Sequence, residues 1–152
     1  MTSFEQVLFV SQADAEAMQP SPKTALISIT DPGRPNAILQ PGWSAVHRAV
    51  FDDIDPVGYP DDYDAMLAIS DEQALAIAHF VLATAQTCRT LVVHCRYGVS
   101  RSAGIAKAVA QAFGLPFPVA YDEANEFVYR AVRWALLEAG VAGKIEGRSA
   151  DA

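Results

Sequence analysis

The segment from His94 to Ser102 constrains the fold of this chain most, because it joins an apolar run to a helical pattern through a short loop. It reads His-Cys-Arg-Tyr-Gly-Val-Ser-Arg-Ser and follows the apolar residues Leu91–Val93. The apolar run predicts a buried strand, and the residues that follow the loop predict a helix over Ser102–Phe113, ended by Gly114. This order of strand, tight loop and helix favours an α/β architecture.

The rest of the chain repeats the alternation of strands and helices. Short apolar or β-branched runs predict strands at Val7–Val10, Lys23–Thr30, Ser44–Phe51 and Thr90–His94. Helices are predicted at Gln12–Met18 with Ser11 as cap, after the capping box Ser70-Asp71-Glu72-Gln73, at Ser102–Phe113 and at Tyr121–Ala139. Proline, glycine and aspartate predict loops at Arg34–Trp43 and Asp52–Asp64. We expect an α/β fold with a central, mainly parallel sheet of four to five strands flanked by helices.

Helical periodicity predicts the faces of the two long helices that pack on the core. In the helix after Ser70 the predicted core residues are Ala74, Ile77, Phe80, Val81 and Thr84. In the last helix they are Ala124, Phe127, Val128, Ala131, Ala135 and Leu136. We expect one domain over residues 1–142. The polar, glycine-containing residues 143–152 predict a flexible tail without a role in function.

Composition excludes several classes of protein. The 152 residues suffice for one domain with a sizeable core, and 51% hydrophobic with 19% charged residues is typical of a globular chain. A formal net charge of -7 argues against a nucleic-acid partner, which would require a basic face. The first residues lack the pattern of a signal peptide, and no apolar run has the length of a membrane span. We expect a cytoplasmic protein with no membrane partner.

The two cysteines, Cys88 and Cys95, cannot form a disulfide framework. The strand predicted between them would separate them by roughly 23 Å, far beyond the reach of a disulfide bond. We therefore expect free thiols in a reducing compartment. Cys88 is interpreted as a small apolar side chain at the boundary of an element.

The loop from Cys95 to Arg101 has the properties of a phosphate site. Backbone N–H groups that point inward above a helix N-terminus can hold a phosphate dianion, and Gly98 permits the backbone conformation that such a ring requires. Arg101, in the first helical turn, can donate to two phosphate oxygens at once. The loop residues expected to line the substrate are Arg96, Tyr97, Gly98, Val99 and Ser100, together with Ser102.

The same loop should activate Cys95. A thiol ringed by amides at a helix N-terminus and close to Arg101 is expected to have a lowered pKa and to act as a nucleophile. Ser100 and Ser102 can donate hydrogen bonds into the loop, and Ser102 can stabilise the departing thiolate. His94 is expected to orient Cys95 by a backbone hydrogen bond rather than to act as a base.

The signature His-Cys-x5-Arg-Ser resembles that of the cysteine-dependent protein tyrosine phosphatases, and its wording is most similar to the dual-specificity branch. The likeness extends over roughly residues 44–139. It implies a phosphotyrosine phosphatase-like fold and hydrolysis of phosphomonoesters through a phosphocysteine intermediate, without a metal or another cofactor. Low-molecular-weight tyrosine phosphatases and arsenate reductases carry a similar loop near the chain start, so the place of Cys95 argues against both.

The resemblance also implies a general acid on the loop after the third predicted strand. The expected residue is Asp53, followed by Asp52 and then Asp55. This loop is longer than in compact dual-specificity enzymes, so Asp61, Asp62 or Asp64 could take the role instead.

The substrate is less constrained than the chemistry. Arg96 is the only basic residue among the five inner loop positions, which disfavours a phosphoinositide, and Tyr97 is expected at the mouth. His47 and Arg48 could contact an anionic substrate, although solvated or strand-paired side chains are the simpler interpretation. Three hypotheses remain: a tyrosine or dual-specificity phosphatase, the same chemistry on a nucleotide, sugar phosphate or RNA 5′ end, and a phosphate-binding module without turnover.

Overall fold

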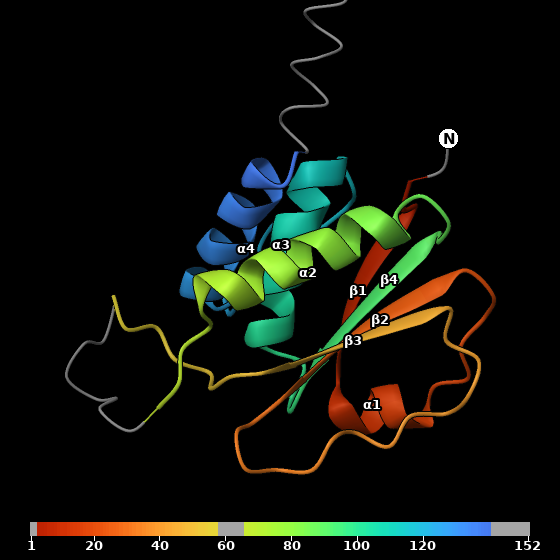
Figure 1. The fold of residues 1–152 in the computed structure, drawn as a ribbon, viewed down its shortest axis with the longest axis horizontal. Helices are drawn as coiled ribbons and strands as arrows, with labels where there is room; N and C mark the ends of the chain where they lie inside the picture. Colours follow the sequence, from red (N-terminus) through yellow and green to blue (C-terminus); the bar gives the residue numbers. More distant parts are fainter. Residues whose placement is uncertain (1–2, 58–65, 141–152) are drawn as a thin grey trace, which may run out of the picture.

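A computed structural model describes residues 3–57 and 66–140, and its strands form one all-parallel sheet of four strands (Figure 1). The strands are β1 (Gln6–Ser11), β2 (Thr24–Thr30), β3 (Ala45–Val50) and β4 (Thr90–Cys95). They lie in the order β1-β4-β2-β3, so β4 and β2 occupy the middle of the sheet. The predicted α/β fold with a central parallel sheet is confirmed, and each of the four predicted strands is present.

The two middle strands are apolar because both of their faces are covered. All seven residues of β2 are buried, as are the last five of β4. In the register of the sheet, Ser11 lies opposite Cys95 on one side of β4, and Ser28 lies opposite His94 on the other. Parallel pairing thus brings the carboxyl ends of these strands to one edge, where their loops meet.

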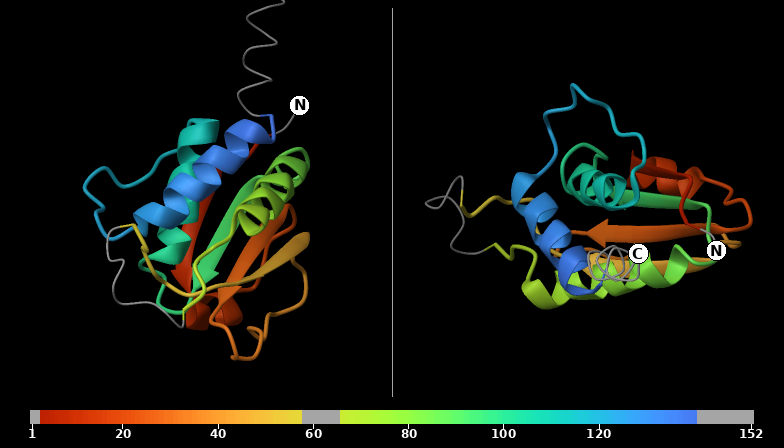
Figure 2. Two further views of the ribbon diagram at one scale, coloured as in Figure 1. Left: turned by 60° about the vertical axis from the view of Figure 1, so that its left-hand side comes forward. Right: turned by 90° about the horizontal axis from the view of Figure 1, so that it is seen from above.

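The helices are α1 (Gln12–Ala17), α2 (Asp71–Thr84), α3 (Arg101–Phe113) and α4 (Glu126–Glu138). The longer three cover one face of the sheet: α3 packs on β1 and β4, α2 packs on β3, and α4 lies between α2 and α3 (Figure 2). The core on this face joins strand residues such as Ile27 and Val93 to helix residues such as Ile77, Val109 and Val132. Helix α1 follows β1 directly and lies at the edge where the strands end (Figure 1).

Side-chain caps begin the helices where the sequence predicted them. Ser11 caps α1 by accepting from Asp14, and Ser70 forms the predicted capping box with Gln73. In α2 the predicted core residues Ala74, Ile77, Val81 and Thr84 are buried, whereas Phe80 is only partly buried.

The start predicted for the last helix is wrong. Helix α4 begins at Glu126 and not at Tyr121, because the Asn125 side chain accepts a hydrogen bond from the Val128 amide and so caps the helix there. The buried face shifts accordingly: Phe127 and Ala131 are only partly buried, and Ala124 is buried outside the helix. The residues that α4 buries are Val128, Tyr129, Val132, Ala135 and Leu136.

Two predictions extend beyond the described residues. Residues 52–57 form a loop as predicted, although Ile54 is buried in it, and the part of this loop after residue 57 lies largely outside the described residues. The predicted tail, 143–152, lies entirely outside them. Among the helices of residues 3–57 and 66–140, none is long and apolar enough to cross a membrane.

Candidate active site

The loop that carries the signature connects the centre of the sheet to the helix layer. Cys95 is the last residue of β4 and Arg101 is the first residue of α3, and both side chains are buried. The N-cap of α3, Ser100, makes no side-chain capping hydrogen bond, so its hydroxyl does not occupy the amides of the first turn. The positive end of α3 therefore faces the loop, in the arrangement that binds anions at helix N-termini.

Gly98 fixes the path of this loop. Its φ of +72° lies in the left-handed region, and a Cβ placed on it would come within 2.4 Å of the Ser11 nitrogen and of the Val10 carbonyl carbon. The loop thus packs directly against the end of β1, where only glycine fits. The expectation that Gly98 permits a special backbone conformation agrees with this geometry.

The Cys95 thiol is held in a polar setting inside a buried site. Its Sγ lies 3.1 Å from the Ser102 Oγ, and both side chains are buried. Burial by itself raises the pKa of Cys95, but hydrogen bonds from the Ser102 hydroxyl and from the Ser102 and Gly98 amides, with the Arg101 charge, lower it further than burial raises it. The net pKa of Cys95 lies below the ordinary value of a thiol.

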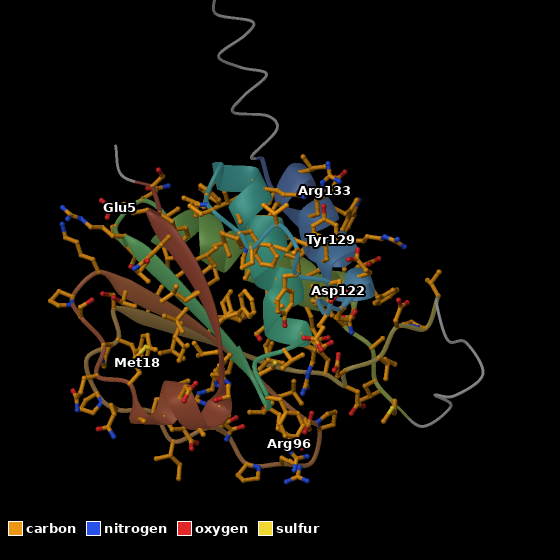
Figure 3. The ribbon with its side chains drawn as sticks, turned by 180° about the vertical axis from the view of Figure 1, so that it is seen from behind. Glu5, Met18, Arg96, Asp122, Tyr129 and Arg133 are labelled. Carbon is orange, nitrogen blue, oxygen red and sulfur yellow. The ribbon has the colours of Figure 1, made fainter. Side chains whose placement is uncertain are left out.

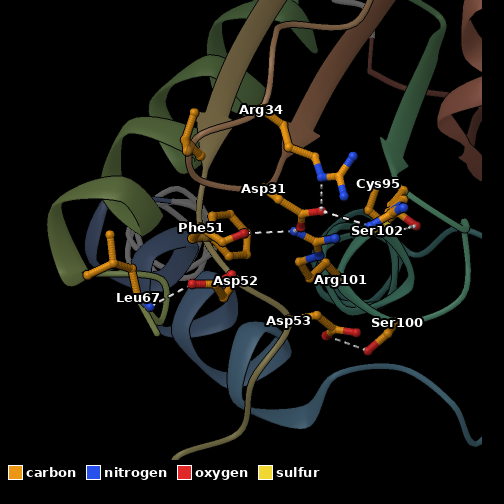
Figure 4. A network of polar contacts seen from close by, with 12 residues as sticks. Asp31, Arg34, Phe51, Asp52, Asp53, Leu67, Cys95, Ser100, Arg101 and Ser102 are labelled. Atoms are coloured by element: carbon orange, nitrogen blue, oxygen red, sulfur yellow. Dashed lines mark hydrogen bonds and ion pairs between the residues drawn. The ribbon is translucent and has the colours of Figure 1, made fainter. Parts of the chain in front are cut away.

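Arg101 is oriented by two acceptors (Figure 4), and one of its buried nitrogens has no partner among the described residues. Its Nη1 donates to the Phe51 carbonyl at 2.7 Å and lies 2.8 Å from the Asp31 Oδ1. Within the described residues its buried Nε has no hydrogen-bond partner. A buried N–H without an acceptor is costly, so this one indicates a place where an anion can bind.

Asp31 is a site residue that the sequence did not reveal. No role was predicted for it, yet its carboxylate faces Arg101 and, at 3.8 Å, Arg34 (Figure 4), and it lies 3.7 Å from the Arg96 guanidinium. The signal that would have located it is the sheet order, because β2 neighbours β4 and their carboxyl ends meet. The strand order itself was not predicted.

His94 is fully buried between β2 and the loop. Its Nδ1 lies 3.3 Å from the Cys95 carbonyl oxygen, and its Nε2 lies 2.6 Å from the Ser28 Oγ. Burial lowers the pKa of His94, which keeps the ring neutral. Because the carbonyl can only accept, the proton belongs on Nδ1 and Ser28 donates to Nε2. The ring thus contacts the backbone of Cys95, as expected. Its second partner, Ser28, was missed, although a single serine within an apolar strand could have indicated it.

The candidate acids occupy different positions around the loop. The Asp53 carboxylate accepts from the Ser100 hydroxyl at 2.7 Å and from the Asn125 side chain at 2.9 Å, so it faces the loop from outside while remaining exposed (Figure 4). Asp52 instead accepts from the Leu67 amide at 2.8 Å, and Asp55 accepts from the Val57 amide. The other three candidates, Asp61, Asp62 and Asp64, lie outside the described residues.

Asn125 also connects the acid segment to the loop. Its amide donates to the Asp53 carboxylate and to the Ile54 carbonyl, and its backbone N–H donates to the Ser100 carbonyl at 2.9 Å. The sequence had placed it in the interior of a helix, so this role was missed. An asparagine before an amphipathic pattern is a helix-cap signal and could have located it.

The remaining predicted loop residues form the outer rim. Arg96, Tyr97 and Val99 are exposed, and the Arg96 guanidinium lies over the Tyr97 ring. The Tyr121 hydroxyl donates to the Val99 carbonyl and so braces the loop from the segment before α4.

The contacts of the His47 and Arg48 side chains lie away from the signature loop. His47 packs against Phe80 of α2, and Arg48 donates to the Ala37 carbonyl. This matches the simpler interpretation that they are strand residues.

The described part of the chain holds no cluster of three or more His, Cys, Asp or Glu side chains suited to a metal ion. Its two cysteines are both free, in agreement with the prediction that Cys88 and Cys95 do not pair. A comparison of the chain with models of known protein families finds no match, and a comparison with curated proteins finds no match either.

Proposed function

We propose that this protein is a cysteine-dependent phosphatase, similar to the dual-specificity branch of the tyrosine phosphatases, that hydrolyses phosphomonoesters of tyrosine and of other alcohols. The observation that carries the proposal is that two buried groups occur together. The Cys95 thiol has a lowered pKa and lies against the Ser102 hydroxyl, and the Arg101 Nε has no acceptor within the described residues. A thiolate supplies the nucleophile, and the open donor of Arg101 supplies charge for the phosphate.

In the proposed first step, the Cys95 Sγ attacks phosphorus and the bond from phosphorus to the leaving oxygen breaks. Asp53 gives its proton to that oxygen, so an alcohol departs and a phosphocysteine remains. In the second step water attacks phosphorus, the sulfur–phosphorus bond breaks, and the Asp53 carboxylate takes a proton from the water. The loop amides and Arg101 stabilise the equatorial oxygens in both steps, which is why no metal is invoked.

The position of Asp53 supports its role over that of Asp52. Asp53 is hydrogen-bonded to Ser100 inside the signature loop, whereas Asp52 is engaged with Leu67. A proton donor has to come within hydrogen-bond reach of the leaving oxygen, and the rim of the loop is where that oxygen would lie. A reducing, cytoplasmic setting would keep the thiol of Cys95 active.

Hydrolysis of para-nitrophenyl phosphate and of a phosphotyrosine peptide in the presence of EDTA tests the proposal. We expect metal-free turnover by the wild type, inhibition by vanadate, and a loss of about 10⁴-fold or more in Cys95→Ser. Cys88→Ser is the matched control, since its thiol lies near the start of β4 and outside the loop. An inert wild type would overturn the proposal and favour a phosphate-binding module or a specialised non-protein substrate.

A further inference from the structure

A cavity of about 310 Å³ opens beside the signature loop, next to the position proposed for the phosphate. Its lining comes from three segments that meet at the carboxyl edge of the sheet: α1, the end of β2 with the following turn, and the start of the loop. The residues from these segments that carry its polar groups are Gln12, Glu16, Thr30, Asp31, Arg34 and Arg96. A pocket of this volume suits a small polar group rather than an extended chain.

Two arginines of this cavity have donors available. The Arg34 and Arg96 side chains are 59% and 43% exposed, and each reaches Asp31 only loosely, at 3.8 and 3.7 Å. In the part of the chain that the structure describes, neither guanidinium makes a shorter polar contact. Both are therefore free to turn toward an anion without breaking a strong interaction.

The carboxylates of the cavity are already engaged. Asp31 is 2.8 Å from Arg101, and Glu16 accepts from the Ile38 amide at 2.8 Å and from Gln12 at 3.2 Å. The Ile38 and Gln12 hydrogen bonds lower the pKa of Glu16, so it is ionised at neutral pH. Because Asp31 is held closely by Arg101 and Glu16 by Ile38 and Gln12, neither carboxylate makes a close ion pair with Arg34 or Arg96. The donors of these two arginines are thus the groups that an anion in the cavity would meet.

The link to the reaction centre is Asp31. Its Oδ1 faces Arg101 while its Oδ2 faces Arg34 and Arg96, so one carboxylate separates the proposed phosphate position from the cavity (Figure 4). Arg96 also directly follows Cys95 in the chain and lies beside α1, where its carbonyl accepts from the Gln12 amide (Figure 3).

We propose that this cavity binds a second anionic group of the substrate, so that preferred substrates carry a phosphate or carboxylate close to the phosphate that is hydrolysed. Arg34 and Arg96 hold the second anion, and Gln12 and Thr30 offer hydrogen bonds to neighbouring hydroxyl groups. The inference rests on the proposed function, because it concerns the same substrate molecule. Such a substrate preference would distinguish this protein from a phosphatase that recognises only the aromatic ring of phosphotyrosine.

The test compares substrates that differ only in the second charge. One pair is propanediol bisphosphate and propanediol monophosphate, and the other is a phosphotyrosine peptide with glutamate beside the phosphotyrosine and the same peptide with glutamine. For at least one pair, kcat/KM of the wild type should favour the charged member by about 10- to 100-fold. The pair that shows the preference identifies the source of the second anion.

Arg34→Gln and Arg96→Gln should each bring this ratio down toward one, since each removes one cation of the cavity. Arg133→Gln on α4 is the matched control: it removes an exposed arginine on another element and should leave the ratio unchanged. Circular dichroism checks that the variants fold.

A wild-type ratio near one in both pairs, or a ratio that survives both cavity substitutions, would overturn the inference. Turnover of para-nitrophenyl phosphate by the same wild-type sample keeps the two proposals apart. If that substrate is hydrolysed while the ratios are near one, the cavity proposal alone fails. If it is not hydrolysed, the phosphatase proposal fails with it.

Discussion

The signature loop and the aspartate segment that faces it are held in place by different means. Cys95, Arg101 and Ser102 lie within one short stretch of chain, and all three are buried where β4 passes into α3. The places of Cys95 and Ser102 follow from the end of β4, the left-handed Gly98 and the start of α3, and the buried Arg101 is also held by the Phe51 carbonyl and Asp31.

Asp53 is instead positioned by partners that are distant in sequence. Asp53 is exposed, and its carboxylate accepts hydrogen bonds from Ser100 and Asn125, which are 47 and 72 residues away. The proposed nucleophile and phosphate-binding groups are thus buried within one contiguous segment, whereas the proposed acid is exposed and depends on the docking of separate segments. Substitutions in the loop should therefore remove chemistry, and substitutions around Asp53 should change its pH dependence.

The largest effect after loss of the nucleophile is expected for Arg101→Lys. Lysine keeps the positive charge but cannot bridge the Phe51 carbonyl and Asp31 while presenting a second donor to phosphate. We expect kcat/KM for para-nitrophenyl phosphate to fall by about 10²- to 10³-fold. Arg130→Lys, on the exposed side of α4, serves as control, and near-normal activity of Arg101→Lys would remove the arginine from the proposed mechanism.

Asp53→Asn tests the role proposed for the exposed aspartate. A general acid has to be protonated, so its loss should flatten the basic limb of the pH–rate profile, whereas the acidic limb, which reports formation of the thiolate, should remain. We expect kcat to fall by about 10²-fold near the optimum, with a smaller effect on a substrate with a good leaving group. Asp52→Asn is the matched variant, and a larger loss there than in Asp53→Asn would reassign the acid.

A smaller effect is expected for Ser102→Ala. Removing the hydroxyl takes away one of the hydrogen bonds that lower the pKa of Cys95, so that pKa should rise and the acidic limb of the rate profile should move to higher pH. Activity below the optimum should fall by about 10-fold. The rate of alkylation of Cys95 by iodoacetamide against pH measures the shift directly.

Ser100→Ala separates the two roles of the loop serines. The Ser100 hydroxyl donates to Asp53 and does not cap α3. The pH midpoint of Cys95 alkylation should therefore stay unchanged in Ser100→Ala. An unchanged midpoint in Ser102→Ala would contradict the account of how the thiol is activated.

The smallest effect concerns stability rather than catalysis. Ser28→Ala removes the donor to the buried Nε2 of His94 and leaves that nitrogen without its partner. We expect the free energy of unfolding to fall by about 1–3 kcal/mol in a urea titration. Unchanged unfolding would show that the ring does not depend on Ser28.

Much of the fold followed from local patterns that the structure bears out. The apolar run of β2, the capping box at Ser70 and the glycine after α3 each act over a few residues, and the sequence displays them directly. The start of α4 was misplaced because helical periodicity extends through Tyr121 to Asn125, while the Asn125 backbone N–H donates to the Ser100 carbonyl and its side chain caps the helix. A side-chain cap outweighs periodicity at a helix terminus.

The same distinction applies to the site. Cys95, Arg101 and Ser102 could be named from their spacing because a contiguous motif needs no tertiary information. Asp31 and Ser28 could not, since their relation to the loop arises from the neighbouring positions of β2 and β4 in the sheet. Strand order is set by packing over the whole domain, which short patterns do not encode.

In the proposed mechanism the phosphoryl group passes through the sulfur of Cys95. Rapid quenching of the wild type during turnover of para-nitrophenyl phosphate, followed by mass spectrometry of its peptides, tests this most directly. We expect one phosphoryl group on the peptide that contains Cys95. Controls of Cys88→Ser without substrate should show no such adduct. A phosphoryl group on another residue, or turnover that persists at the wild-type rate in Cys95→Ser, would contradict it.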